Sequence, residues 1–328
     1  MIWSQLSLAH VFEAANRIRP LVRRTELAES PALADETGAA SVLLKLESLQ
    51  NTGAFKVRGA ANRILSLSDP ERRRGVITFS TGNHGKAVAY VAGQSGIPAV
   101  VCVSEHVAAY RVERIRRFGA EVVVKGHSQD EAEVEYDRIR EQRGMVPVVP
   151  FDDPYVVCGQ GTIGLEMLAD APDLDTILVP LSGGGLLSGV ALAAKLIRPG
   201  INVVGVSIRR SPAMLKSLRA GRSVAVEEKD TLADSLLGGI GTENHYTLPL
   251  VEHYVDEHVM VDEPEIERAM YYMLSEHSLV VEGGAAVGIA ALQTGVVRVA
   301  GKHVGLVISG SSVDLGRYVA LMERHTGG

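Results

Sequence analysis

Lys56 is the residue of this sequence whose position most clearly suggests chemistry. It lies between Phe55 and Val57, where an alternating apolar segment gives way, through a polar turn, to a helical pattern. An ammonium that is partly desolvated and close to a helix N-terminus has a lowered pKa, because both surroundings disfavour its charge. Such a lysine is a nucleophile for carbonyl carbon and a candidate for Schiff-base formation. A lysine in a first helical turn is more often simply solvated, so this interpretation depends on the rest of the chain.

A predicted anion site follows in Ser80-Thr81-Gly82-Asn83-His84-Gly85, which comes after a strand pattern and opens a helical one. Backbone N–H groups and small hydroxyls at such a junction bind anions, and they suit a carboxylate. Ser80 and Thr81 could serve only as helix N-caps, which is the commoner role. Asn83 can donate and accept hydrogen bonds, which is more than a cap requires.

A second anion site is predicted at Ser182-Gly183-Gly184-Gly185-Leu186, between an apolar strand and a helix. Bare backbone amides at a helix N-terminus bind phosphate. A dinucleotide site requires G-x-G-x-x-G and an acidic residue about 20 positions later. Counting from Gly183, the sixth residue is Ser188, and Ile201 to Ile208 contains no acid. The loop therefore indicates a compact monophosphate.

A small-residue turn, Ser309-Gly310-Ser311-Ser312, follows the predicted strand Val304 to Ile308. Open α/β sheets bind ligands at the carboxyl ends of their strands. Alone, the turn would carry no functional meaning. Together with Lys56 and the two anion sites, it completes what a pyridoxal-phosphate site requires, namely an aldehyde anchor, a substrate carboxylate site, a phosphate site and a partner for the ring nitrogen.

Short apolar strands alternate with helical patterns almost throughout, which predicts an α/β fold with parallel sheets covered on both faces. The predicted strands are Val42 to Leu46, Val76 to Phe79, Ala99 to Val103, Glu121 to Val124, Val146 to Val149, Thr176 to Val179, Val203 to Ser207 and Val304 to Ile308. The predicted helices are Val57 to Leu67, Gly85 to Ser95, Ala108 to Phe118, Gln129 to Gln142, Gly159 to Leu168, Leu187 to Leu196 and Glu263 to Ser278.

Composition limits the partners. With 328 residues, 46% of them hydrophobic, the chain is long enough for two domains. The net charge of -6 and the interspersed bases argue against a nucleic-acid or anionic-membrane partner. Cys102 and Cys158 are too few for a disulfide framework and lack metal-ligand spacing, which favours a reducing cytoplasm. The uncharged run Thr176 to Ala194 is broken by Pro180 and three glycines, so it indicates a strand, a loop and a helix, with no membrane span.

Four ordered motifs resemble the signature set of the threonine dehydratase/serine racemase family, which are fold type II pyridoxal-phosphate enzymes with the tryptophan synthase β-like fold. They are Thr52 to Ala60, Ser80 to Gly85, Gly183 to Leu186 and Ser309-Gly310, and they extend over nearly the whole chain. The resemblance implies two doubly wound open-sheet domains. Residues 1–67 and 148–328 would form the large cofactor-binding domain, residues 68–147 a small mobile domain, and the protein a homodimer.

The resemblance also implies site residues. Lys56, beside Phe55, would hold the cofactor aldehyde, Asn83 would bond the ring hydroxyl, and Ser309 would face the pyridine nitrogen. The phosphate would be bound by Ser182, Gly183, Gly184, Gly185 and Leu186. The substrate carboxylate would be bound by Ser80, Thr81, Gly82, Asn83 and His84. Lys56 and Thr81 would be the catalytic residues.

The implied reaction is β-elimination from a β-hydroxy amino acid. Lys56, displaced by the substrate amine, would remove the Cα proton, hydroxide would leave Cβ, and the product would hydrolyse to a 2-oxo acid and ammonia. A neutral hydroxyl at the ring nitrogen leaves the ring largely unprotonated, which favours elimination over transamination. An amino-acid racemase, and a pyridoxal-phosphate binder without turnover, are the alternatives.

Three positions depart from the family pattern. Ala54 stands where the dehydratases of threonine and serine usually carry Ser, which implies a different substrate. Thr81 stands where racemases place a proton-donating Ser, and its β-branch restricts the side-chain rotamer. Ser207 stands where many relatives have a metal-ligating Glu, so no metal site is expected.

Ala54, together with Gln160 to Glu166 and Thr231 to Gly241, most resembles the hydroxyectoine-utilisation dehydratase branch of the family. That branch implies a substrate like 3-hydroxy-2,4-diaminobutyrate or its acylated form, with threonine or serine as the alternative. Glu282 and Asp234 are candidates to receive the nitrogen at Cγ, although either could be a structural acid.

Overall fold

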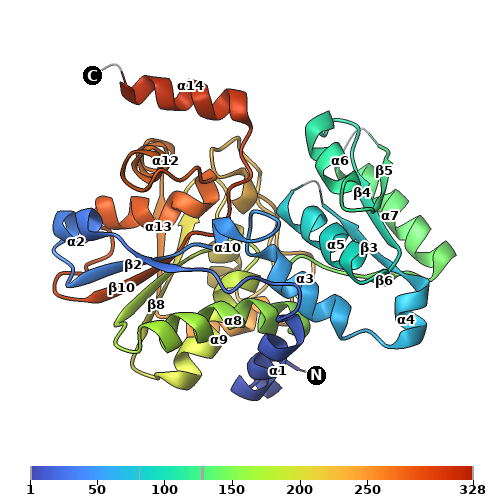
Figure 1. The fold of residues 1–328 in the computed structure, drawn as a ribbon, viewed down its shortest axis with the longest axis horizontal. Helices are drawn as coiled ribbons and strands as arrows, with labels where there is room; N and C mark the ends of the chain where they lie inside the picture. Colours follow the sequence, from blue (N-terminus) through green and yellow to red (C-terminus); the bar gives the residue numbers. More distant parts are fainter. Residues whose placement is uncertain (1, 81, 127–128, 327–328) are drawn as a thin grey trace.

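The strands of the protein form two separate sheets (Figure 1). The computed structural model describes residues 2–80, 82–126 and 129–326. The first sheet has the strand order β1-β2-β10-β7-β8-β9, and the second has the order β5-β4-β3-β6. Elements of the first sheet come from both ends of the chain, whereas all strands of the second lie between residues 76 and 147.

The six-stranded sheet is parallel except at one edge. Its strands are β1 (Leu27–Glu29), β2 (Ser41–Lys45), β7 (Thr176–Pro180), β8 (Asn202–Ile208), β9 (Glu257–Val261) and β10 (His303–Val307). Only β1 pairs antiparallel, with β2. The sequence did not predict β1 or β9, because β1 has three residues and the exposed half of β9 is polar. The predicted parallel, doubly covered architecture is confirmed for the other strands.

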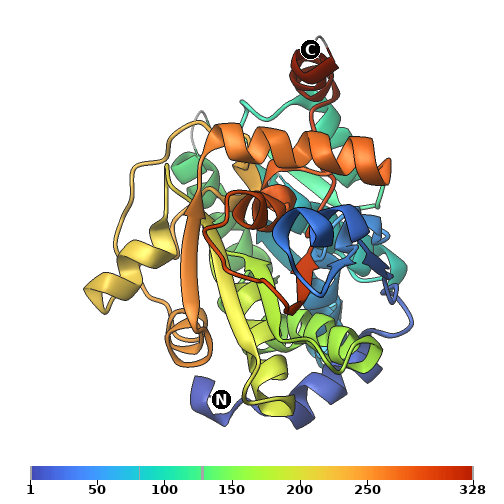
Figure 2. The same ribbon diagram turned by 90° about the vertical axis from the view of Figure 1, so that its left-hand side faces the viewer.

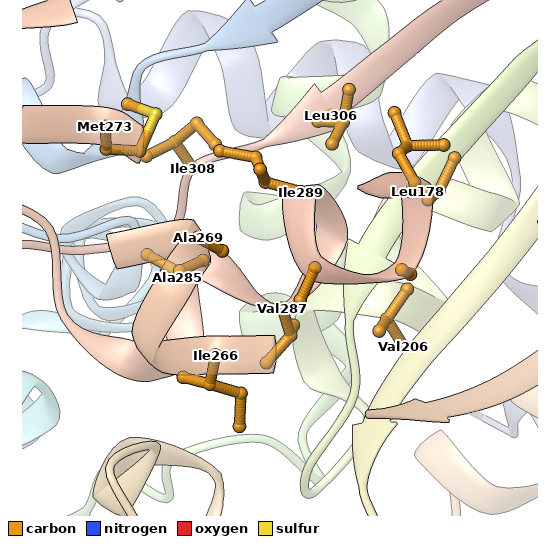
Figure 3. Packing of buried hydrophobic residues seen from close by; sticks show 14 of the residues in the cluster. Leu178, Val206, Ile266, Ala269, Met273, Ala285, Val287, Ile289, Leu306 and Ile308 are labelled. Atoms are coloured by element: carbon orange, nitrogen blue, oxygen red, sulfur yellow. The ribbon is translucent and has the colours of Figure 1, made fainter. Parts of the chain in front are cut away.

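Alternate residues of the central strands face opposite helical layers, as the period of two in a strand requires. Leu178, Val206 and Leu306 pack against α13 (Gly283–Gln293), which itself packs against α12 (Glu263–His277), as Figure 3 shows. On the other face, Ile177, Val179 and Val203 pack with residues of α8 (Pro154–Asp170) and α9 (Gly185–Ile197). The two helical layers lie on opposite sides of the sheet in Figures 1 and 2.

The four-stranded sheet is entirely parallel. It consists of β3 (Val76–Phe79), β4 (Ala99–Val103), β5 (Glu121–Val124) and β6 (Val146–Pro147). Its helices are α4 (Asp69–Arg74), α5 (Asn83–Gln94), α6 (Ala109–Arg116) and α7 (Gln129–Arg143). The helix α3 (Lys56–Leu65) contacts both α5 and α8, so it lies between the two sheets.

The remaining α-helices are α1 (Leu8–Ile18), α2 (Pro31–Thr37), α10 (Ala213–Ala220), α11 (Thr247–Tyr254) and α14 (Leu315–Thr326). The sequence predicted α8 to begin at Gly159, but it begins five residues earlier at Pro154. The reason is the Asp153 carboxylate, which accepts hydrogen bonds from the N–H groups of Tyr155 and Val156 at 2.8 and 3.0 Å. Thr176 to Ala194 forms the predicted strand, loop and helix. No helix within the described ranges is both long and apolar enough to cross a membrane.

Candidate active site

Lys56 is the first residue of α3, one residue before the predicted start of the helix at Val57, and its side chain is held in place. Its Nζ donates a hydrogen bond to the Pro150 carbonyl at 2.8 Å and lies 5.2 Å from the centre of the Phe55 ring. Burial lowers the pKa of Lys56 from 10.5 to about 8, and the negative charge of Glu282 opposes part of that shift. Near pH 8, about half of this lysine is therefore the neutral, nucleophilic amine.

This pKa leads to a labelling prediction. Acetylation by acetic anhydride requires the neutral, free amine, so in protein stripped of any bound cofactor the labelling rate of Lys56 should rise with pH and reach half its maximum near pH 8. In urea-denatured protein, the labelling rate of the same residue should reach half its maximum at about pH 10.4, the pKa of a solvated lysine. Competitive labelling followed by mass mapping measures both curves. Coinciding midpoints would show that the folded site does not depress this pKa.

The turn after β10 holds the segment that precedes Lys56. The Phe55 N–H donates to the Ser309 carbonyl at 3.0 Å, and Ala54 forms an isolated bridge with Gly310. The Ser309 side chain is buried, and its hydroxyl bonds to no other group within the described ranges. The structure thus brings Lys56 and Ser309, which are far apart in the sequence, to the same strand edge.

Asn83, the first residue of α5, is part of a network between the two sheets. Its Nδ2 donates to both carboxylate oxygens of Glu282 at 2.9 Å, and its Oδ1 accepts from the Ser312 hydroxyl at 2.5 Å. The Ser312 N–H also donates to Glu282, at 2.9 Å. Burial raises the pKa of Glu282, and the hydrogen bonds from Asn83 and Ser312 act in the opposite direction. Glu282 therefore joins the candidate site as a hydrogen-bonded acid.

The predicted carboxylate loop surrounds the start of α5. The first bond into this helix runs from the Lys86 N–H to the Gly82 carbonyl, so the N–H groups of Asn83 and His84 are left for a ligand within the described part of the chain. The His84 imidazole is itself buried and bonds the Val148 carbonyl at 2.8 Å. Burial, aided by the charge of Lys56, lowers the pKa of His84 to about 3, so the ring is neutral. Thr81, predicted to be catalytic, lies outside the described residues.

The predicted phosphate loop has the conformation and the free donors that an anion requires. Gly184 has a φ of 87°, which only glycine adopts readily, and it precedes α9. The N–H groups of Gly183, Gly184 and Gly185 donate to no other group of the described chain, although all three residues are buried. A Cβ at Gly183 would lie 2.4 Å from the ring of Phe151, the residue after Pro150. The loop and Lys56 therefore meet at Pro150 and Phe151.

Buried donors without partners are rare in folded proteins, and each costs free energy unless a ligand satisfies it. Here they form a row at a helix N-terminus, where the dipole favours negative charge. The unbonded hydroxyl of Ser309 and the amine of Lys56 add a second donor and a nucleophile. This donor set fits a phosphorylated aromatic aldehyde such as pyridoxal phosphate.

Arg58 anchors α3 two residues after Lys56, and motif reasoning assigned it no role. Its guanidinium makes bidentate contacts with both Glu47, at 2.8 Å, and Glu166, at 2.7 and 2.8 Å. Lys45 also contacts Glu166, at 2.6 Å. The side chains of Arg58, Glu47 and Lys45 are at most 1% exposed. The available signal was a charged residue within the apolar helical pattern that begins at Lys56.

Motif reasoning also missed Lys86, and it included Ser312 only as a member of the turn after β10. The side chains of Lys86 and Ser312 bond each other at the edge of the site. Lys86 follows Asn83 by three residues, a spacing that places both on one helix face. Ser207, predicted to replace a metal ligand, is buried in β8. Within the residues that the structure describes, no cluster of three His, Cys, Asp or Glu side chains could hold a metal ion.

Comparison with known proteins gives consistent matches over most of the chain. The family model described as "Pyridoxal-phosphate dependent enzyme" matches residues 18–310. The L-threonine ammonia-lyase of Thermotoga maritima is 43% identical over 310 residues, which cover 94% of this chain and 76% of that protein. The catabolic L-threonine dehydratase of Staphylococcus aureus is 36% identical over 321 residues, which cover 97% of this chain and 92% of that protein.

Solved structures agree with these matches. Maize serine racemase superposes with a TM-score of 0.90 at 34% identity, and the alignment covers 98% of both chains. The T.th. threonine deaminase superposes with a TM-score of 0.87 at 34% identity, covering 94% of this chain and 99% of that one. The likeness therefore includes both sheets.

Proposed function

Because the chain belongs to the family of pyridoxal-phosphate dependent enzymes, we propose that it is a lyase that eliminates the β-hydroxyl of an amino acid and releases ammonia and a 2-oxo acid. The observation that carries the proposal is the meeting of Lys56, with its lowered pKa, and the row of unbonded glycine amides at Pro150 and Phe151. The names of the relatives, L-threonine ammonia-lyase and L-threonine dehydratase, support this reaction class.

The proposed cofactor contacts follow from the donors present. Lys56 would hold the aldehyde beside Phe55, and Ser309 would face the ring nitrogen with a neutral hydroxyl. Asn83 would bond the ring hydroxyl, and for this its amide must exchange one of its present partners, Glu282 or Ser312. The backbone of Ser182, Gly183, Gly184, Gly185 and Leu186 would bind the phosphate.

The catalytic work of the chain falls mainly on Lys56. When bound, pyridoxal phosphate supplies an electron sink for the bond broken at Cα. The neutral amine of Lys56 would accept the Cα proton, and the Pro150 carbonyl, 2.8 Å away, would orient it. Ser80, Gly82, Asn83 and His84, with Thr81, would bind the substrate carboxylate through backbone donors. Because the His84 ring is neutral and bonded to Val148, it would fix the loop and leave proton transfer to Lys56.

For the substrate, we propose a β-hydroxy amino acid with nitrogen at Cγ, like 3-hydroxy-2,4-diaminobutyrate or its acylated form, as in hydroxyectoine catabolism. Ala54, which stands where the dehydratases of threonine and serine usually carry Ser, supports a different substrate. Asp234 has one carboxylate oxygen on Arg111, at 3.0 Å, so its second oxygen is the better candidate to receive the nitrogen than Glu282, which already binds Asn83 and Ser312. Threonine or serine is the alternative, supported by the relatives' names.

A substrate panel tests the reaction. Purified holoenzyme should release equal amounts of ammonia and 2-oxo acid from at least one of L-threonine, L-serine, 3-hydroxy-2,4-diaminobutyrate and its N4-acetyl derivative. A racemase would instead return a Cα-deuterated substrate with inverted configuration and without the label. A binder without turnover would show the bound cofactor's colour and change none of the four compounds, and that result would refute the proposed reaction.

The phosphate loop leads to a binding prediction. A Cβ on Gly184 would lie 2.6 Å from Met214 Cε and 2.9 Å from Thr247 Cβ, in a backbone conformation that L-residues avoid. We expect Gly184→Ala to weaken cofactor binding at least about 10-fold, because the loop must move to relieve the clash. Titration of the apoprotein by absorbance measures the dissociation constant. Gly96→Ala is the matched control, since Gly96 has a φ of 64° and open space around it. Equal affinities of the two variants would contradict the assignment.

Three wider features belong to the proposal. The separate sheet of β3, β4, β5 and β6 supports a small domain of residues 68–147 that moves against residues 1–67 and 148–328.

Cys102 and Cys158 are both free thiols and buried, which fits a reducing cytoplasm. The homodimer is proposed from the family resemblance, and sedimentation of the holoenzyme tests it.

A further inference from the structure

Lys86 is a cation at the edge of the proposed site that has no carboxylate partner among the described residues. It lies on α5, one helical turn after Asn83, and its half-buried Nζ donates to the Ser312 hydroxyl. A lysine ammonium carries three donors, and this contact uses one of them. A partly desolvated ammonium without an anionic partner is unfavourable, so the site has capacity for an acceptor from a ligand.

The neighbouring charged groups do not neutralise the positive charge of Lys86. Burial, with a smaller contribution from Arg114 and Arg111, lowers the pKa of Lys86 to about 8, although the charge of Glu282 opposes the shift. Arg111 is neutralised by Asp234 at 3.0 Å. Glu282 receives its hydrogen bonds from Asn83, Ser312 and Ser235, and it forms no ion pair with Lys86.

The contacts of Lys86 place it next to where a substrate would bind. Ser312, which accepts from Lys86, also donates to Asn83 at 2.5 Å, and Asn83 begins the loop proposed for the substrate carboxylate. The charge of Glu282 acts on both Lys56 and Lys86, so all of these groups share one site. If an amino acid binds at this loop, an atom one or two bonds beyond its Cβ therefore lies where Lys86 can donate a hydrogen bond to it.

We propose that Lys86 determines specificity by binding an acceptor oxygen carried by the substrate side chain, either a carboxylate or an acyl carbonyl. The inference rests on the proposed function in that it takes the ligand to be an amino acid held at the Ser80 to His84 loop. It narrows the substrate class, because an ammonium at Cγ would be repelled by Lys86 whereas an acylated nitrogen presents a carbonyl. The acylated form of the diamino substrate is thus favoured over the free diamine.

Ligands without a β-hydroxyl cannot undergo elimination, so their binding tests the proposed role of Lys86 separately from the proposed reaction. We would titrate holoenzyme by its cofactor absorbance with L-aspartate, N4-acetyl-2,4-diaminobutyrate, 2,4-diaminobutyrate and 2-aminobutyrate. At least one of the first two should bind about 10-fold or more tighter than 2-aminobutyrate, since a charge-assisted hydrogen bond is added. The free diamine should bind more weakly than its acetyl derivative.

Two variants test whether Lys86 is the donor and whether the acceptor on the ligand is a carboxylate or an acyl carbonyl. Lys86→Met should abolish the preference and leave the affinity for 2-aminobutyrate within about 3-fold, which also shows that the variant is folded. Lys86→Gln keeps a neutral donor, so it should retain binding of an acyl carbonyl and lose that of a carboxylate. Equal affinities for all four ligands in the unaltered enzyme, or equal losses for all four in Lys86→Met, would overturn the inference. Absence of ammonia release from the hydroxylated substrates would refute the lyase and leave these binding results valid.

Discussion

Lys56→Ala is expected to lower the rate of ammonia release by at least about 10³-fold, because the variant lacks both the nucleophile for the cofactor aldehyde and the base for the Cα proton. The reason is structural as well as chemical. Pro150 holds the amine at 2.8 Å, and His84 is a poor replacement for it as the base, since burial lowers the pKa of its ring to about 3 and the ring is bonded to Val148. Purified protein should also lose the visible absorption of a lysine-bound cofactor.

The measurement is coupled release of ammonia and 2-oxo acid, together with an absorbance spectrum of each protein. Lys302→Ala is the matched control, because Lys302 is an exposed lysine outside the site. It should keep full activity and the full absorption band. A Lys56→Ala enzyme with undiminished turnover would remove the basis of the proposed function, whatever the substrate.

Arg58→Met is expected to lower the free energy of unfolding by about 3–5 kcal/mol, the usual result of removing one partner from a buried ion network. The substitution leaves the carboxylates of Glu47 and Glu166 with Lys45 as their remaining cation, in surroundings where Glu47 and Lys45 are fully buried. The methionine fills most of the volume but supplies none of the hydrogen bonds.

Urea unfolding of the apoprotein, followed by circular dichroism, measures this difference. Arg24→Met removes a comparable pair with Asp170, but those side chains are 57% and 37% exposed, so it should cost about 0–1 kcal/mol. Arg58→Lys keeps the charge and loses the bidentate geometry, and it should fall between the two. If Arg58→Met and Arg24→Met unfold at the same urea concentration, the buried network does not stabilise α3.

Much of the fold was predictable from the sequence. Strands β3, β4 and β5 begin and end at the predicted residues. β3 and β4 are almost entirely buried, and a parallel strand covered on both faces is largely apolar, whereas β5 at the sheet edge was found from its three valines. Short or half-exposed strands such as β1 and β9 carry no such pattern. The helix α13 is rich in glycine and alanine, so its hydrophobic face could not be distinguished, although it forms the layer that Figure 3 shows.

The residues of the candidate site were likewise only partly predictable from the sequence. Lys56, the glycine loop and the turn at Ser309 were found because each follows a strand, and the carboxyl ends of parallel strands meet at one edge. The link from Asn83 to Glu282 joins residues far apart in the chain, and its geometry depends on how the two sheets pack. Lys86 and Arg58 look like ordinary helix-surface charges in the sequence, and only their burial distinguishes them.

The position of β10 between β2 and β7 has a consequence for biosynthesis. β2 ends at Lys45 and β10 begins at His303, so at about 5–20 residues per second a ribosome needs tens of seconds between the two. During that time β2 lacks its parallel neighbour, and the segment carrying Lys56 lacks the Ser309 carbonyl that holds it. The nascent chain therefore exposes one unpaired edge of the apolar strand β2 until β10 has been made, a state in which chaperones would bind it, and the lysine acquires its complete surroundings for a vitamin-derived group only after that.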